Sequence, residues 1–197
     1  MAKKVYIITG PIGSGKSTAI EHLKNKGYKT VDLDVVSNKI LTSKQSLNFL
    51  KKEFSKSLIN GVVDRSLLAE IVFNNKDKLL ILENYLHPKV LYKLQNIIQN
   101  TDDLLFVEVS APKNVYKDFE SIVIFTDAET RMSRLLERGM DREDIVSRMA
   151  SQKSDDWWKS LGIVVQNNNL SELKIEHQSR ASAREADFWY IRLESKP

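Results

Sequence analysis

The sequence predicts an α/β fold with a parallel five-stranded sheet flanked by helices, a helical insertion and a helical lid. Three observations support this prediction. A strand, a helix and a strand follow one another within residues 5–34, a helical pattern fills residues 35–100, and two helices joined at a glycine follow residue 126. Consecutive strand–helix–strand units build parallel sheets, because the helix returns the chain to the end from which the next strand starts.

The strands are expected where short runs of β-branched, aromatic and other apolar residues occur, as in strands buried on both faces. These runs are residues 5–8, 28–31, 104–109, 121–125 and 161–165. A helix over 17–26 separates the first two and stops at Gly27, a typical residue for the position after a helix. A polar turn is expected at 166–169, and the charged, weakly periodic tail from 174 to 197 gives no prediction.

Helix-capping residues divide the remaining segments. In the helical block, Asp64 is expected to cap one helix, and Pro88 to occupy the first turn of another. Thr126 and Glu129 have the spacing of a capping box, with Thr126 as the N-cap of a helix that ends at Gly139. Asp141 is expected to cap the next helix, which runs towards residue 152.

Composition limits the classes of function. The chain has 197 residues with 42% apolar and 28% charged side chains, as in an ordinary globular protein. It has no cysteine, which excludes disulfide scaffolds and thiolate chemistry. Its net charge of +4 suits a polyanionic ligand, but the lysines form no basic block. With no secretory signal and no long apolar run, we expect a soluble cytoplasmic protein that binds neither nucleic acid nor membrane.

The strongest motif is a complete phosphate-binding loop between the first strand and its helix. Residues 10–17 match G-x-x-x-x-G-K-[ST] in full. In such loops backbone N–H groups surround the phosphates, the lysine reaches the β- and γ-phosphates, and the hydroxyl ligates Mg²⁺. The expected ligands are therefore ATP and Mg²⁺. The expected nucleotide contacts are Gly10, Ile12, Gly13, Ser14, Gly15, Lys16, Ser17 and Thr18, with Ser17 also on the metal.

Other motifs select a small-molecule kinase among proteins with this loop. The base-reading N-K-x-D motif of GTPases is absent, since residues 75–77 have the wrong spacing, and so is the L-S-G-G-Q signature of transport ATPases. Asp32 and Asp34 follow the second strand, at the sheet edge where ligands bind. Asp34 is the candidate to orient and deprotonate an acceptor hydroxyl near the metal, whereas Asp32 is expected to shape the loop. The alternative is that both are turn residues.

Arginines on the lid form the second candidate group. Arg131, Arg134 and Arg138 are spaced to share one helix face, where they can neutralise charge on a transferring phosphoryl group. Ion pairs with Glu137 and Asp141 are the alternative.

Four further residues have two interpretations each. Glu108 ends a strand, as carboxylates near a metal do, or is an edge residue. His87 caps a helix or belongs to a site, and Trp157 with Trp158 packs in the core or stacks on adenine.

Together these residues resemble the dephospho-CoA kinase family over about residues 5–173. The matching segments are Thr9-Gly10, residues 12–18, Val31-Asp32-Leu33-Asp34, residues 61–68 with Ile71-Val72-Phe73, residues 86–90, Arg134, Glu137-Arg138 and residues 148–152. The resemblance implies ATP-dependent phosphorylation of dephospho-CoA. It implies a nucleotide-binding core (1–34, 101–129 and 159–173), a helical CoA-substrate domain (35–100) and a lid (130–158).

Site roles carried over from the family are as follows. The resemblance implies that Asp34 faces the ribose 3′-hydroxyl and that Arg134 faces the transferring phosphate. Thr9 is then expected to line the site of that phosphate. Arg65 and His87 are expected to lie near the acceptor. Catalysis is expected from Lys16, Asp34, Arg134 and Arg138, and metal binding from Ser17 and Asp34. The chain departs from the family pattern at Pro11, at residues 109–113, at Leu161-Gly162 and in the tail.

Two alternatives to this function stay open. One is a kinase acting on a nucleoside monophosphate or a sugar acid. The other is a nucleotide-binding regulator that has lost catalysis. The chain is expected to be a monomer or a weak homo-oligomer.

Overall fold

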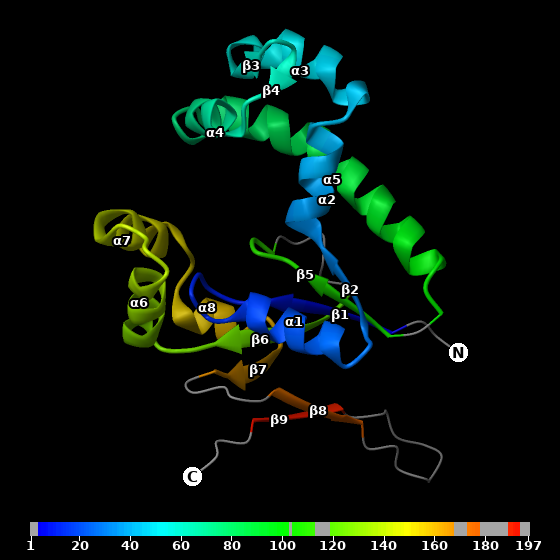
Figure 1. Cartoon of the computed structure of the whole chain (residues 1–197), viewed down its shortest axis with the longest axis vertical. Coiled ribbons are helices and arrows are strands. Elements are labelled where there is room, and N and C mark those ends of the chain that lie inside the picture. Colours follow the sequence, from blue (N-terminus) through cyan, green and yellow to red (C-terminus); the bar gives the residue numbers. More distant parts are fainter. Residues whose placement is uncertain (1–3, 103, 113–118, 168–172, 178–188, 194–197) are drawn as a thin grey trace. The chain divides into compact units, whose positions relative to one another are not determined.

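The computed structural model describes residues 4–102, 104–112, 119–167, 173–177 and 189–193 (Figure 1). The chain forms two compact units. Residues 31–102 form one, here called the helical unit, and residues 2–30 with 103–197 form the other, called the sheet unit. In the described parts of both units, no helix is both long and apolar enough to cross a bilayer.

A five-stranded sheet carries the fold, as predicted. Its strands are β1 (Val5–Thr9), β2 (Lys29–Asp32), β5 (Leu105–Glu108), β6 (Glu120–Phe125) and β7 (Ile163–Gln166), in the order β2-β5-β1-β6-β7. β1 pairs in parallel with β5 and β6, and β6 pairs in parallel with β7. Because β1 is central, the loop after it opens at the middle of the carboxyl edge, where open α/β sheets bind ligands.

Helices cover both faces of the sheet. α1 (Lys16–Asn25) buries Ala19, Ile20 and Leu23 against one face, among Tyr6, Ile8, Phe106, Ile122, Ile124 and Val165. On the other face α8 (Asp155–Lys159) places Trp158 against Val123 and Phe125. Trp158 is therefore a core residue, which confirms the packing interpretation over adenine stacking for this side chain. Gly27 has φ of 87° and follows α1 as predicted.

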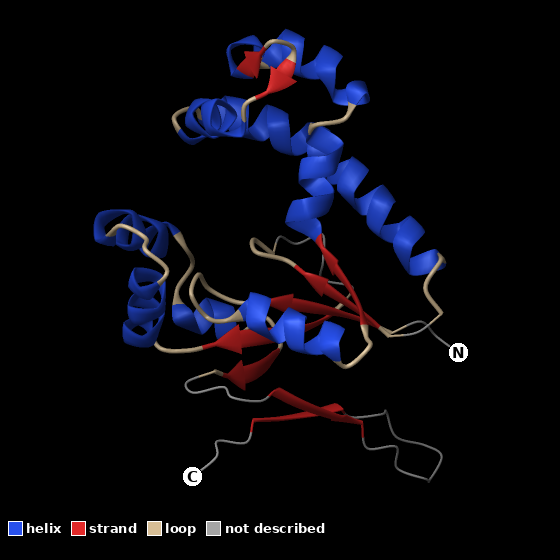
Figure 2. Ribbon diagram, in the orientation of Figure 1, coloured by secondary structure: helices blue, strands red, loops and turns tan. Residues whose placement is uncertain are grey.

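The helical unit consists of α2 (Leu33–Leu41), α3 (Leu47–Glu53), α4 (Arg65–Phe73) and α5 (Lys76–Gln99), with two short 3₁₀ turns (Figure 2). Its core surrounds Leu50 and Phe54, both almost fully buried. Asp64 caps α4 as predicted, accepting hydrogen bonds from the backbone N–H groups of Ser66 (2.9 Å) and Leu67 (3.0 Å). A small hairpin of β3 (Leu58–Ile59) and β4 (Val62–Val63) precedes α4.

The prediction that Pro88 begins a helix is wrong, because α5 runs through it. The helix starts at a different cap, Asn75, whose side chain accepts from the N–H of Lys78. A proline inside a helix costs about 3 kcal/mol, since it removes one backbone hydrogen bond. Buried Leu82 on one side of Pro88 and buried Val90 and Leu94 on the other outweigh that cost. His87 consequently lies mid-helix and caps nothing.

The predicted lid helices are α6 (Ala128–Glu137) and α7 (Arg142–Ser151). Asp141 caps α7 as expected. The N-cap of α6 is Asp127 and not Thr126, so that prediction is wrong by one residue. Asp127 accepts from the N–H of Thr130 at 2.7 Å, while the buried Thr126 hydroxyl donates to the Asp127 carboxylate. A carboxylate is the stronger acceptor and also suits the positive end of the helix dipole.

The tail, for which we made no prediction, contains an antiparallel pair, β8 (Leu173–His177) with β9 (Trp189–Leu193). Of the turn predicted at 166–169, Gln166 is the last residue of β7, and residues 168–169 lie outside the described part of the chain.

Candidate functional site

The phosphate loop is held by close backbone contacts at two glycines. Gly13 (φ 77°) lies against α6, where an added Cβ would come within 3.0 Å of the Arg131 carbonyl oxygen. Gly15 (φ 95°) precedes α1, where an added Cβ would overlap Asn167 Nδ2. Both positions therefore exclude larger residues by backbone conformation and by space. The loop is thereby packed between α6 and Asn167, which follows β7.

Lys16 extends along the loop. Its Nζ donates to the carbonyl oxygens of Gly10 (2.8 Å) and Pro11 (3.1 Å). The Pro11 carbonyl also accepts from the N–H of Ser14 at 3.3 Å, so Pro11 takes part in the turn through its carbonyl group. The unusual proline is thus compatible with a formed loop, because the turn uses no N–H from that position.

One cavity, here called the loop cavity, lies beside the loop and has a volume of about 290 Å³. Its lining residues are Ile12, Gly13, Gly15, Lys16, Ser17, Glu108, Ser110, Leu135, Arg138, Met140 and Arg148. It combines three cationic side chains with two hydroxyls and a carboxylate. Glu108, half-buried at the end of β5, thus belongs to the site, which favours the site interpretation over that of an edge residue.

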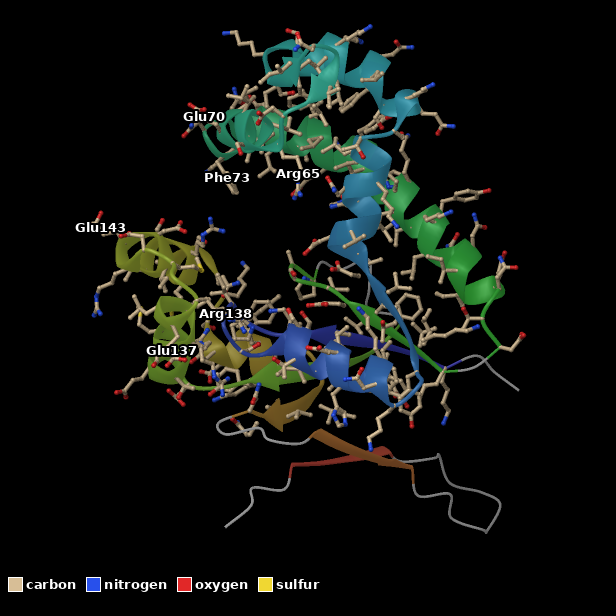
Figure 3. The ribbon with its side chains drawn as sticks, viewed as in Figure 1. Arg65, Glu70, Phe73, Glu137, Arg138 and Glu143 are labelled. Carbon is tan, nitrogen blue, oxygen red and sulfur yellow. The ribbon has the colours of Figure 1, made fainter. Side chains whose placement is uncertain are left out.

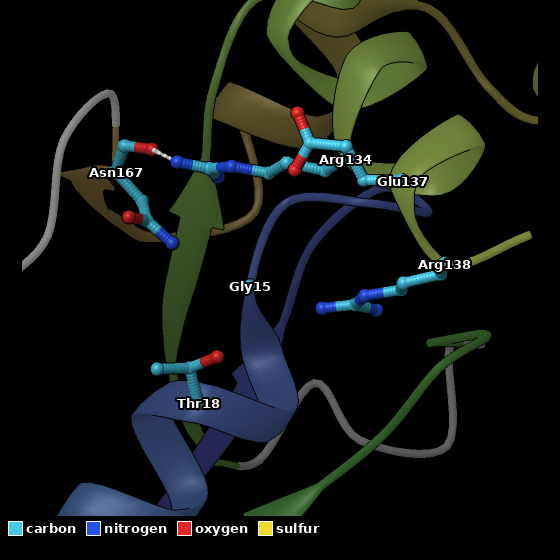
Figure 4. A pocket seen from close by; sticks show the side chains of 6 residues that line it. All are labelled: Gly15, Thr18, Arg134, Glu137, Arg138 and Asn167. Atoms are coloured by element: carbon cyan, nitrogen blue, oxygen red, sulfur yellow. Dashed lines mark hydrogen bonds between the residues drawn. The ribbon is translucent and has the colours of Figure 1, made fainter.

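A second cavity, called the Asn167 cavity, measures about 400 Å³ and shares Gly15 and Arg138 with the first (Figure 4). Thr18, Arg134, Glu137 and Asn167 complete its lining. Arg134 Nη2 donates to the backbone carbonyl of Asn167 at 2.8 Å, which ties α6 to the end of β7. The two cavities together extend from the loop, along the start of α1 where Lys16 lies, to Asn167 after β7.

Asn167 is the main site residue that the sequence interpretation missed. It is 3% exposed, and its Nδ2 donates to the carbonyl of Ser14 at 2.7 Å. Its own N–H donates to the carbonyl of Phe125, also at 2.7 Å. The side-chain Oδ1 is buried with no hydrogen-bond partner among the described residues. A polar residue directly after the last parallel strand, at the ligand-binding edge, was the signal available in the sequence.

The three arginines of the predicted lid do not act as one group. Arg131 is 5% exposed and its guanidinium donates to Asp155 at 2.9 Å, which joins α6 to α8. The expectation that all three arginines face the site is therefore wrong for Arg131, and its ion-pair partner is neither Glu137 nor Asp141. Arg134 and Arg138 do line the cavities. Arg138 lies at the end of α6, next to Glu137 (Figure 3).

Of the residues predicted on the acceptor side, Asp34, Arg65 and His87 belong to the helical unit and Thr9 belongs to the sheet unit. Asp32 caps α2 by accepting from the N–H groups of Asp34 (2.8 Å) and Val35 (3.1 Å), so it shapes the turn as expected. Asp34 is exposed in the first turn of α2, directly after β2. Arg65 is exposed at the start of α4 (Figure 3), and His87 is partly buried in α5. Their roles towards an acceptor stay predictions.

Thr9 ties the end of β1 to the chain after β5. Its buried hydroxyl donates to the carbonyl of Val109 at 2.7 Å, and the N–H of Val109 donates to Ile8 at 3.0 Å. Val109 is the first residue of the segment 109–113, which departs from the family pattern, and these two hydrogen bonds fix it to the central strand β1. The next residue, Ser110, lines the loop cavity. A role of Thr9 in lining the acceptor site stays a prediction.

The residues at the loop fit a Mg²⁺ ion that is shared with phosphate groups. Mg²⁺ is usually bound by one or two protein oxygens together with phosphates and water. Ser17 and Glu108 supply such oxygens in the loop cavity. Within the described residues, no group of three or more acidic or histidine side chains forms an all-protein cage. The donor set therefore matches a metal that arrives with a nucleotide.

The electrostatics at the start of α6 are set by its cap. Hydrogen bonds from the backbone N–H and the hydroxyl of Thr130 lower the pKa of Asp127 below its ordinary value of 3.8. Asp127 is thus ionised at neutral pH and stabilises the start of the helix that carries Arg134 and Arg138.

Comparison with known proteins gives a consistent result. Residues 5–172 match the family model described as dephospho-CoA kinase. A dephospho-CoA kinase of Fusobacterium nucleatum is 30% identical over 182 residues, covering 88% of this chain and 94% of that protein. The structure of dephospho-CoA kinase from Campylobacter jejuni aligns with a TM-score of 0.64 at 30% identity, covering 86% of this chain and 90% of that one. A Thermus thermophilus structure aligns with a TM-score of 0.76 at 27% identity, covering 86% and 91%.

Proposed function

The chain belongs to the dephospho-CoA kinase family, and we propose that it transfers the γ-phosphoryl group of Mg-ATP to the ribose 3′-hydroxyl of dephospho-CoA, giving CoA and ADP. The observation that carries the proposal is the pair of cavities that share Gly15 and Arg138 at an intact phosphate loop, in a chain that matches this family over 168 of its 197 residues (5–172). A nucleotide-binding loop alone fits many enzymes, and the family match supplies the acceptor.

The two cavities suggest how ATP lies. The triphosphate follows the loop, with its β- and γ-phosphates at Lys16 and Ser17 in the loop cavity. The nucleoside then occupies the Asn167 cavity, which is lined by Thr18, Arg134 and Asn167. Lys16 exchanges its two backbone carbonyl partners for phosphate oxygens, which are stronger partners because they are charged.

The proposed transfer is an in-line displacement. The ribose 3′-oxygen attacks the γ-phosphorus, the bond to the β–γ bridging oxygen breaks, and ADP takes the bonding electrons. Asp34 accepts the proton of the hydroxyl, while Lys16, Arg134 and Arg138 stabilise charge on the phosphate oxygens. Ser17 and Asp34 are the residues proposed to hold Mg²⁺, which would neutralise charge on the phosphate groups. Thr9, Arg65 and His87 are proposed to contact the acceptor.

The proposal is tested by Asp34→Asn with Asp77→Asn as a matched control. Asp77 is also exposed in the first turn of its helix, α5, in the same unit. If Asp34 is the base, Asp34→Asn lowers kcat for dephospho-CoA by at least about a hundredfold and leaves the ATP affinity within about twofold. Asp77→Asn changes neither quantity. Near-normal turnover of Asp34→Asn would remove Asp34 from the chemistry.

A further inference from the structure

The hairpin of β3 and β4 turns at Asn60-Gly61, which forms its two-residue loop. Both residues have positive φ, 51° and 78°, as a type I′ turn requires. Both are exposed, and no described atom lies within 4 Å of the position that a Cβ on Gly61 would take. The Gly61 N–H is therefore not shielded by a side chain of its own residue or by a packed neighbour, as the amide after most asparagines is.

The two residue pairs of this hairpin differ in burial. The inner pair is Leu58 with Val63, which packs on the core of the helical unit. The outer pair, next to the loop, is Ile59 with Val62, and these side chains are 51% and 66% exposed. Opening the outer pair therefore exposes little additional apolar surface, and a hairpin this short is marginally stable by itself. The tip can open and re-form while the core of the unit stays packed.

We propose that Asn60 is a site of spontaneous deamidation. When the tip opens, the backbone nitrogen of Gly61 attacks the side-chain carbonyl carbon, Cγ, of Asn60 and closes a succinimide ring. The bond from Cγ to the amide nitrogen breaks, and ammonia leaves with the proton of the Gly61 N–H. Water then opens the ring at either carbonyl. Opening at Cγ gives aspartate, whereas opening at the main-chain carbonyl gives isoaspartate, in which the main chain continues through Cβ and Cγ.

The isoaspartate product changes the start of the helix that follows. It adds one methylene to the main chain in a loop whose length fixes the register of the hairpin. At the base of the hairpin the N–H of Asp64 donates to the carbonyl of Ser57 at 2.7 Å, and Asp64 also caps α4. The first residue of α4 is Arg65, so its position depends on the hairpin. This consequence rests on the proposed function, in which Arg65 contacts the acceptor: isoaspartate in the loop weakens the binding of dephospho-CoA.

The first test follows the modification itself. Wild-type protein is incubated for days at mildly alkaline pH, and the peptides that contain Asn60 and Asn48 are followed by mass spectrometry, with isoaspartyl methyltransferase to quantify isoaspartate. Asn48 is the matched control, since it is exposed in the same unit but is followed by Phe49. Asn60 is expected to convert at least about tenfold faster than Asn48, because glycine has no Cβ to hinder ring closure. Equal rates at the two positions would overturn the proposal.

The second test follows the consequence in fresh and incubated protein. Incubated wild type is expected to have a KM for dephospho-CoA at least about threefold above that of fresh protein, the scale of one weakened hydrogen bond, with ATP affinity within about twofold. Asn60→Gly removes the amide and keeps a residue suited to positive φ, so incubation leaves its KM unchanged. Asn60→Asp supplies the other product without the added methylene, and it keeps the KM of fresh wild type. An unchanged KM in protein converted to isoaspartate would refute the coupling through Asp64.

The two tests separate this inference from the proposed function. Fresh wild-type protein that does not phosphorylate dephospho-CoA would refute the proposed function, and the mass measurement would still decide whether Asn60 is modified. Turnover of dephospho-CoA by a protein in which Asn60 converts no faster than Asn48 would do the reverse.

Discussion

Replacing Asn167 with alanine tests how the end of β7 supports the phosphate loop. The change removes the hydrogen bond from Nδ2 to the Ser14 carbonyl and keeps the one from Arg134, which reaches the backbone of Asn167. A buried carbonyl left without a donor costs roughly 1–3 kcal/mol. The space left by the missing amide adds about 1 kcal/mol. We therefore expect a loss of about 3 kcal/mol, or about 6–12 °C in Tm at 2–4 °C per kcal/mol.

The assay is thermal unfolding with and without ATP, alongside Asn74→Ala as the matched control. Asn74 Nδ2 also donates to a backbone carbonyl, that of Glu70 at 3.0 Å, but at an exposed position. Its loss should stay within about 0.5 kcal/mol, because water replaces the donor. Asn167→Ala should also show a smaller Tm increase on ATP addition, since both Ser14 and the cavity change. Equal Tm values for the two variants would refute the view that Asn167 supports the loop.

Three other changes give independent predictions. Asp127→Ala should lower Tm at pH 7, and the gap to wild type should narrow as pH falls below 3.8. The folded-state pKa of Asp127 is depressed, so its contribution exists above the unfolded pKa and disappears as the carboxylate protonates; a gap that is independent of pH would contradict this. Lys16→Ala should weaken ATP binding in calorimetry roughly tenfold to a hundredfold, since a charged hydrogen bond contributes about 1.5–3 kcal/mol. An affinity within twofold of wild type would exclude Lys16 from phosphate binding. Pro88→Ala should raise Tm, because alanine restores a backbone donor inside α5; a fall in Tm would show that the proline is favourable there.

The parts of the fold that depend on local sequence were predictable. The loop at residues 10–17, the order of strands and helices around it, and the caps at Asp64 and Asp141 all follow from short patterns. The errors at Pro88 and Thr126 arose because other residues nearby determine where the helices begin. Asp127, next to Thr126, is the N-cap of α6. At Pro88 the burial of Leu82 and Leu94 kept the helix continuous.

The candidate site was only partly predictable, because its remaining contacts join residues far apart in the chain. Asn167 reaches Ser14 across 153 positions, and Gln152 reaches Ile12 across 140. The sequence pattern places Arg131 on the same helical face as Arg134. In the structure, however, the Arg131 guanidinium pairs with Asp155 of α8, so Arg131 does not line the site. A spacing along one helix does not specify which neighbouring element packs against it, and that packing decides whether a polar residue is structural or available to a ligand.

The most direct test of the account measures ADP release from Mg-ATP by the wild-type protein with dephospho-CoA, and with AMP, adenosine and gluconate as control acceptors. We predict turnover with dephospho-CoA alone, and a product that carries the new phosphate on the 3′-oxygen. ADP release with a control acceptor and none with dephospho-CoA would contradict the substrate assignment. ATP binding without turnover on any acceptor would contradict the kinase reaction itself and favour a regulator that has lost catalysis.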